Sequence, residues 1–207
     1  PAFPTITENQ TTNAGITVSS LLGGASDLDV GAAQGLALYG LTSGNGTWQY
    51  NTGSGWNNVG AVSATSALLL RDTDQLRFVP NAIKATTGTV SFYAWDRTSG
   101  TFGTKVNVSS RGGTTAFSTI ADTATISATE INDTPTLASG GTRVFTEGSA
   151  ATVIHSTLTL SDVDDLTIAG ATVQISGHYV SGEDVLAFTN QSGITGSWNA
   201  ATGTMTL

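Results

Sequence analysis

Short stretches of alternating apolar and polar residues run through this chain, and turn-forming residues separate them. Examples are TWQYN at 47–51, TVSFYAW at 89–95 and ATVQIS at 171–176. An alternation of period two is typical of strands with one face on a core and one in water. Turn signals such as NG, TG, SG and GG follow at the close spacing of a β-sandwich. The sequence therefore predicts an all-β antiparallel sandwich, with single helical turns at most around 19–22 and 62–70.

Charge and cysteine content exclude several classes of protein. The chain of 207 residues has 15 acidic and 7 basic residues, a net charge of −8, which argues against nucleic acid or an anionic membrane as a partner. It has no cysteine, so rigidity must come from packing or from a hard cation with oxygen ligands. No apolar run is long enough to predict membrane insertion, and residues 1–10 lack the pattern of a signal peptide.

Three short motifs occur twice and indicate an internal repeat of roughly 140 residues. TEN around Glu8 returns as TEG around Glu147, SDLDVG at 26–31 as SDVDDL at 161–166, and GTWQYNTGS from Gly46 as GSWNAATGT from Gly196. The seam is EINDTPTL at 130–137, whose Asn-Asp-Thr-Pro predicts a stiff linker. We expect one repeat over 1–133 and a partial second one over 134–207, which holds only the N-terminal half. Such a half sandwich would leave an open edge and an apolar face.

Acidic residues are grouped in a way that favours cation binding. Asp27 and Asp29 form one Asp-x-Asp motif, and Asp162 and Asp164 form another in the second copy. A calcium ion takes six to eight oxygen ligands, so distant residues must join these pairs. The further candidates are Glu8, Asp96, Asn132 and Asp133. The alternative is that the aspartates only cap loops through Asx-turns, but recurrence in both copies favours the metal.

The order of these motifs resembles the cadherin-like repeats of large bacterial surface adhesins of the RTX type. The pieces that match are Glu8, Asp27-Leu-Asp29, Ala94-Trp95-Asp96, Asn132-Asp133-Thr134-Pro135 and, in the second copy, Glu147 and Asp162-Val-Asp164.

This resemblance implies a secreted or cell-surface protein that works in adhesion, with neighbouring repeats of the chain and surface or matrix glycans as partners. It also implies calcium between the repeats, held by Asn132, Asp133, Asp162 and Asp164 with help from Glu8. A second set at the N-terminal end would comprise Asp27, Asp29 and Asp96.

The aromatic stretch GTWQYNTGSGWNNVG at 46–60 supports an alternative function. Residues 52–55 predict a hairpin turn, and Trp48, Tyr50 and Trp56 could form a platform for sugar rings in a carbohydrate-binding module. The competing interpretation is a core position for Trp48, because the second copy keeps Trp198 but has Ala200 where Tyr50 stands.

No motif of a known catalytic centre accompanies these features. The chain has no nucleophile elbow, phosphate-binding loop or HExxH, and its two histidines, His155 and His178, are explained by strand and loop positions. We therefore expect a binding or structural protein and no enzyme. A third hypothesis is an accessory domain of a secreted polysaccharide-degrading enzyme.

Overall fold

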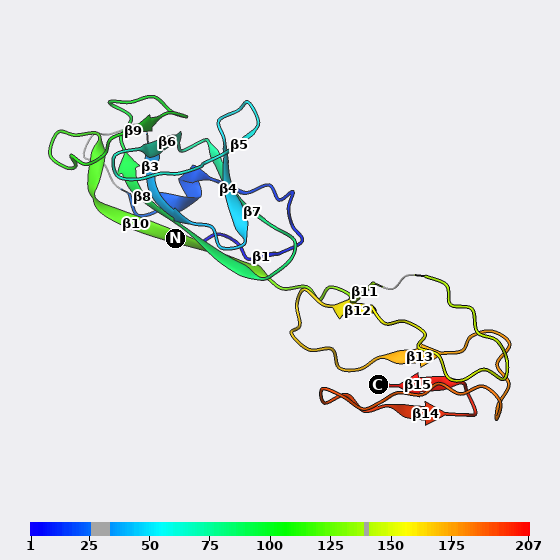
Figure 1. Cartoon of the computed structure of the whole chain (residues 1–207). Helices are drawn as coiled ribbons and strands as arrows, with labels where there is room; N and C mark the ends of the chain where they lie inside the picture. Colours follow the sequence, from blue (N-terminus) through cyan, green and yellow to red (C-terminus); the bar gives the residue numbers. More distant parts are fainter. Residues whose placement is uncertain (26–33, 139–140) are drawn as a thin grey trace. The chain divides into compact units, whose positions relative to one another are not determined.

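The chain forms two compact units in the computed structural model (Figure 1), which describes residues 1–25, 34–138 and 141–207. The first unit is Pro1–Asn132 and the second is Asp133–Leu207. This division falls one residue before the boundary expected from the sequence. That the two units are copies of one repeat stays a prediction.

The first unit is built from two β-sheets, which confirms the predicted all-β class. One sheet has the strand order β1-β10-β8-β3-β6-β9 and the other β2-β7-β4-β5. The elements are β1 (Ile6–Thr7), β2 (Ile16–Thr17), the 3₁₀-helix η1 (Val18–Leu21), β3 (Gly35–Thr42), β4 (Gly46–Asn51), β5 (Trp56–Asn58), β6 (Ala67–Arg71), β7 (Gln75–Pro80), β8 (Thr86–Trp95), β9 (Lys105–Val106) and β10 (Phe117–Thr129). Every pairing between these strands is antiparallel except that of β1 with β10.

The main core lies between these sheets. Its largest side chain, Trp48 of β4, is 1% exposed and packs edge-on against Phe78 of β7, with ring centroids 5.1 Å apart. The indole N–H donates to the carbonyl of Thr42 at 2.9 Å, so the buried polar atom of the ring is satisfied. Leu36 and Leu38 of β3 complete this layer from the other sheet.

A second apolar cluster covers the outer face of the larger sheet. Leu69 of β6 and Trp95 of β8 pack there against Val108, which lies in the long connection between β8 and β10. Strand β6 is therefore buried on both faces. Its four consecutive buried residues are all apolar, so its sequence lacks the alternation of apolar and polar residues that marks a strand. For this reason the helical turn expected within 62–70 is wrong, whereas η1 overlaps the one expected at 19–22.

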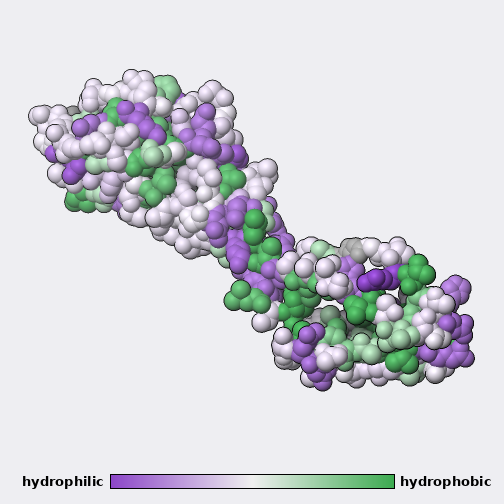
Figure 2. Space-filling view, viewed as in Figure 1, coloured by the Kyte–Doolittle hydropathy of each residue, from purple (hydrophilic) through white to green (hydrophobic). Residues whose placement is uncertain are grey.

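The second unit has short strands and little buried apolar surface. Its strands are β11 (Thr136–Ala138), β12 (Thr159–Ser161), β13 (Thr172–Gln174), β14 (Ser197–Asn199) and β15 (Thr204–Thr206). They form a β11-β12 pair and a sheet of order β13-β15-β14. Among the described residues of this unit, Met205 is the one buried hydrophobic side chain. Several other large hydrophobic side chains of the unit are exposed (Figure 2). No helix in the described ranges is long and apolar enough to cross a membrane.

Candidate functional site

Glu8 is a fully buried carboxylate directly after β1. Its backbone N–H donates to the carbonyl of Thr129 at 2.9 Å and so continues the parallel pairing of β1 with β10. Its Oε1 accepts a hydrogen bond from the backbone N–H of Ile131 at 2.9 Å. Its Oε2 is buried and has no hydrogen-bond partner among the described residues. A carboxylate oxygen that is removed from water and left unpaired is energetically costly, so this atom is a candidate to bind a cation.

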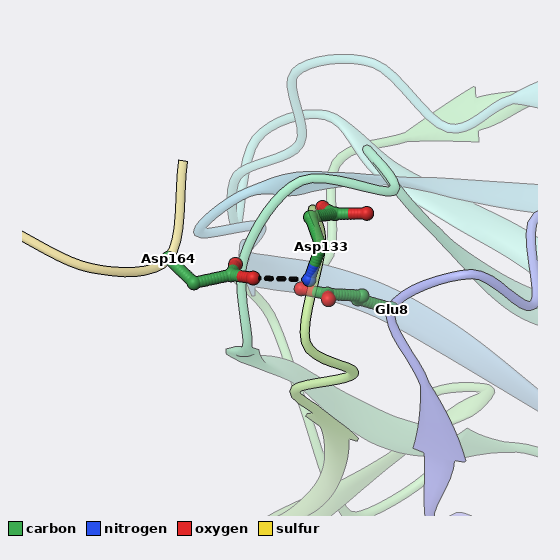
Figure 3. A group of neighbouring side chains, drawn as sticks. All are labelled: Glu8, Asp133 and Asp164. Carbon is green, nitrogen blue, oxygen red and sulfur yellow. Dashed lines mark hydrogen bonds between the residues drawn. The ribbon is translucent and has the colours of Figure 1, made fainter. Parts of the chain in front are cut away.

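The second Asp-x-Asp motif shows a similar feature in the second unit. Asp162 Oδ1 accepts the backbone N–H groups of Asp164 and Asp165 at 2.9 and 3.2 Å, which folds the motif into an Asx-turn. Asp164 Oδ2 accepts the backbone N–H of Asp133 (Figure 3). Asp164 Oδ1 is buried and finds no hydrogen-bond partner in the part of the chain that the structure describes.

The linker stretch 131–133 supplies a backbone N–H group to a carboxylate within each unit. Glu8 is bonded to the N–H of Ile131, Asp164 is bonded to the N–H of Asp133, and Asp133 supplies a third carboxylate (Figure 3). Ile131 and Asp133 are two residues apart, so at most about 7 Å of chain separates their α-carbons. A carboxylate oxygen of Asp133 lies within 4.8 Å of one of Asp164. The ligand type is the hard oxygen donor that calcium and magnesium prefer.

Of the other predicted ligands, Asn132 lies within this same stretch. The Asp162 carboxylate accepts the hydrogen bonds of the Asx-turn described above. Asp96, at the end of β8, lies in the first unit and forms an Asx-turn of its own. Its Oδ1 accepts the backbone N–H of Thr98 at 2.8 Å and the Thr98 hydroxyl at 2.6 Å. Asp27 and Asp29 lie outside the described residues.

The three aromatic residues of the alternative site do not share one surface. Trp48 and Tyr50 pair with Phe78 and Leu76 of β7 and point to the core, although Tyr50 is only partly buried. Trp56 pairs with Asn51 and therefore lies on the opposite face of the sheet. The hairpin predicted over 52–55 is confirmed, because β4 ends at Asn51 and β5 begins at Trp56. The expectation of a sugar-binding platform that includes Trp48 is wrong, because this side chain is buried in the core.

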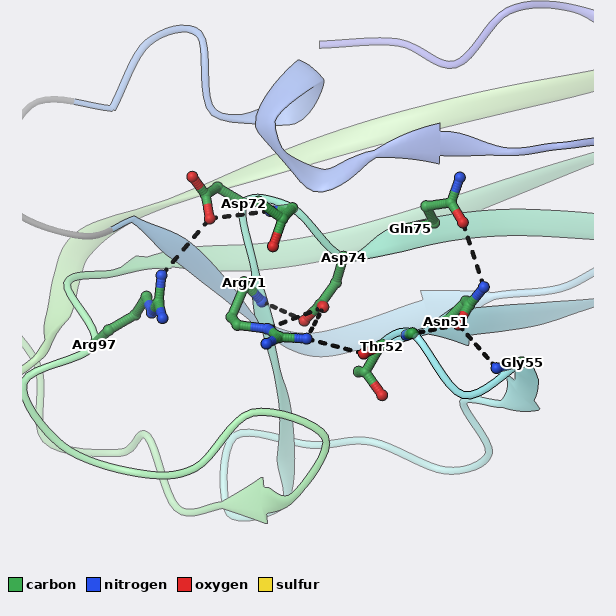
Figure 4. Close-up of polar contacts among 10 residues, drawn as sticks. Asn51, Thr52, Gly55, Arg71, Asp72, Asp74, Gln75 and Arg97 are labelled. Atoms are coloured by element: carbon green, nitrogen blue, oxygen red, sulfur yellow. Dashed lines mark hydrogen bonds and ion pairs between the residues drawn. The ribbon is translucent and has the colours of Figure 1, made fainter.

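The ion pair of Arg71 with the buried Asp74 is not among the features predicted from the sequence. The Asp74 carboxylate is 2% exposed and accepts hydrogen bonds from the Arg71 backbone N–H, Nε and Nη2 at 2.7, 3.0 and 2.6 Å. This bond to Asp74 raises the pKa of the Arg71 guanidinium above its ordinary value. Arg71 Nη2 also donates to the Thr52 carbonyl at 2.9 Å, so the pair braces the β6–β7 turn against the β4–β5 hairpin (Figure 4). The signal available was the RDTD sequence at 71–74, a charged turn between two apolar strands.

Comparison with known proteins adds no relative. The chain matches no protein-family model, no curated protein and no solved structure. Its function therefore has to be argued from its own residues.

Proposed function

We propose that this chain is a calcium-stabilised structural and adhesive repeat of a large extracellular bacterial surface protein. Its role would be to mediate cell or surface adhesion, as in a biofilm, without catalytic activity. The observation that carries the proposal is the pair of buried, unpartnered carboxylate oxygens, Glu8 Oε2 and Asp164 Oδ1, on residues bonded to the linker stretch.

The physical reason is charge. Carboxylates that are close together and removed from water repel one another, and a divalent cation turns that repulsion into attraction. The proposed ligands are Glu8, Asn132, Asp133, Asp162 and Asp164. Because these residues flank or belong to the linker, a bound ion would stiffen the chain between the two units. Stiff tandem units suit a protein that holds a distal binding domain away from a cell.

Calcium binding is tested by isothermal titration with CaCl₂ and, separately, MgCl₂ after removal of metal with EDTA. We expect calcium to bind and to raise the melting temperature. At a free calcium concentration about 1,000 times the dissociation constant, binding to the native state raises the free energy of unfolding by roughly 4 kcal/mol. Magnesium should bind more weakly because it demands octahedral geometry and holds its water.

A matched pair of variants locates the ion. Glu8→Gln keeps the shape of the side chain and should weaken calcium binding strongly. Glu147→Gln, at the position that the sequence pairs with Glu8, is the control because Glu147 is exposed, and it should bind like the wild type. Equal small-angle scattering profiles and melting temperatures in calcium and in EDTA would refute the proposal.

A further inference from the structure

The outward face of the smaller sheet carries an organised set of polar side chains that the calcium proposal does not use. Strand pairing places Gln49, Asn58 and Arg77 in one row across β4, β5 and β7. The next row holds Asn51, Trp56 and Gln75. Both rows alternate along their strands with the core-facing residues, so they point away from the core. All six belong to the first unit.

Arg77 is the centre of this face. Its Nε and Nη2 donate to Gln49 Oε1 at 2.9 and 2.7 Å, and its Nη1 donates to the carbonyl of Asn13 at 3.0 Å. The guanidinium lies over the ring of Trp56, 4.1 Å from its centroid. These contacts use three of its five N–H donors and fix the plane of the group. Partial burial lowers the pKa of Arg77.

The charge of Arg77 has no acidic counterpart on this face. Within the described ranges, the ion pairs of the chain are Arg71 with Asp74 and Arg97 with Asp72, and Arg77 forms none. The six residues of the two rows include no carboxylate. In a chain of net charge −8, Arg77 is therefore a local cationic site that keeps two N–H donors for a ligand.

The neighbouring amides add further donors. Gln49 Oε1 accepts from Arg77, Asn58 Oδ1 accepts from Gln49 Nε2 at 2.9 Å, and Gln75 Oε1 accepts from Asn51 Nδ2 at 3.3 Å. Asn51 Oδ1 accepts the N–H groups of Gly53 and Gly55, which orders the hairpin turn (Figure 4). Each amide oxygen accepts a hydrogen bond, whereas the side-chain N–H groups of Asn58 and Gln75 donate to none of the described residues and can serve a ligand. The face is complementary to a ligand rich in acceptor oxygens.

We propose that this face binds an acidic polysaccharide, with a uronate carboxylate on Arg77 and the adjoining amides and a pyranose ring against Trp56. A guanidinium presents its N–H donors in a plane that suits a carboxylate, and a partly exposed indole ring suits the C–H face of a sugar. A single cation among amide side chains does not suit nucleic acid, which needs clustered Lys and Arg. The inference is independent of calcium at the linker.

The test is titration calorimetry of the whole 207-residue chain with hexagalacturonate, in EDTA and at low ionic strength. EDTA removes calcium bridges between protein and sugar, so a failure here is separate from a failure of the calcium proposal. Cellohexaose, a neutral hexasaccharide, is the second probe. We expect hexagalacturonate to bind, to change tryptophan fluorescence and to weaken as salt is added, and cellohexaose to bind far less.

Three variants locate the site. Trp56→Ala removes the ring, and Asn58→Asp keeps the side-chain shape on the exposed strand β5 while adding a repelling charge. Each should weaken hexagalacturonate binding by about tenfold or more. Phe102→Ala is the matched control, because Phe102 is also partly exposed beneath a guanidinium, with Arg71 3.5 Å from its centroid. It should bind like the wild type.

Any of three results overturns the proposal. The first is no binding of hexagalacturonate by the wild type. The second is cellohexaose binding as tightly as hexagalacturonate, which would assign the face to neutral sugars. The third is unchanged affinity in both Trp56→Ala and Asn58→Asp, with circular dichroism showing that both variants are folded.

Discussion

The two units use one motif with different results. GTWQYN forms β4 in the first unit and the SWN of GSWN forms β14 in the second, yet Trp48 is 1% exposed and Trp198 is only partly buried. Trp48 has Phe3 and Phe78 as ring neighbours at 5.0 and 5.1 Å. Trp198 meets Tyr179 at 6.1 Å. The motif is enough to make a strand, but burial depends on strands from elsewhere in the chain.

Strand pairing explains the difference. In the first unit β4 lies between β5 and β7, and the opposite sheet closes the core over it. In the described part of the second unit, β14 pairs with β15 alone. Trp198 therefore lies in an edge strand of a three-stranded sheet, in a unit with little buried apolar surface, and stays partly in contact with water. The tryptophan of this motif therefore contributes more to the free energy of unfolding in the first unit than in the second.

The sharpest way to break this comparison is to truncate both tryptophans. Trp48→Ala should lower the free energy of unfolding of the first unit by about 3–5 kcal/mol, because it leaves a large cavity between the sheets. Trp198→Ala should cost the second unit about 1 kcal/mol or less. Urea denaturation followed by circular dichroism measures both. Equal losses would mean that the second unit buries its tryptophan as well as the first.

The next comparison uses an aspartate from each unit. Asp74→Ala leaves Arg71 without its carboxylate partner and should cost about 3 kcal/mol, as expected when one member of a buried pair is removed. Asp184 accepts the N–H of Val180 at 2.8 Å, is partly exposed and forms no ion pair with the described residues. Asp184→Ala should cost about 1 kcal/mol. The same denaturation series reads both, and a larger loss for Asp184→Ala would contradict the contrast.

A glycine pair gives the smallest expected difference. A Cβ on Gly46 would lie 2.2 Å from the Phe78 ring and 2.8 Å from the carbonyl oxygen of Val79. A Cβ on Gly196 would lie 2.9 Å from the nearest atoms of Phe188, in a unit with more freedom to adjust. We expect Gly46→Ala to cost about 1–3 kcal/mol and Gly196→Ala less than about 1 kcal/mol. Thermal melting of both variants gives the measurement, and the reverse order would count against a looser second unit.

Local features were predictable from the sequence. The alternation in TWQYN and the Thr-Gly-Ser-Gly turn set β4, β5 and the hairpin, since both depend on residues close in the chain. The expected helical turn within 62–70 is wrong because both faces of β6 are covered, and Val108, which covers one of them, belongs to a distant segment.

Long-range features of the candidate sites were not predictable in the same way. The burial of Glu8 depends on the pairing of β1 with β10. In this pairing Ile6 lies opposite Ala128, a residue far away in the sequence. The contact of Arg77 with Gln49 depends on the register of β4 and β7. No local pattern reports either, because each is fixed only when the sheets assemble.

The parallel pairing of β1 with β10 also determines how the first unit bears mechanical load. Phe3 and Glu8 donate to the carbonyls of Thr125 and Thr129, so a row of bonds ties the start of the unit to its end. A pull between the N-terminus and the linker draws two parallel strands past each other. The bonds of this row are then loaded in shear, all together, whereas an antiparallel hairpin pulled at its open end would lose them one at a time.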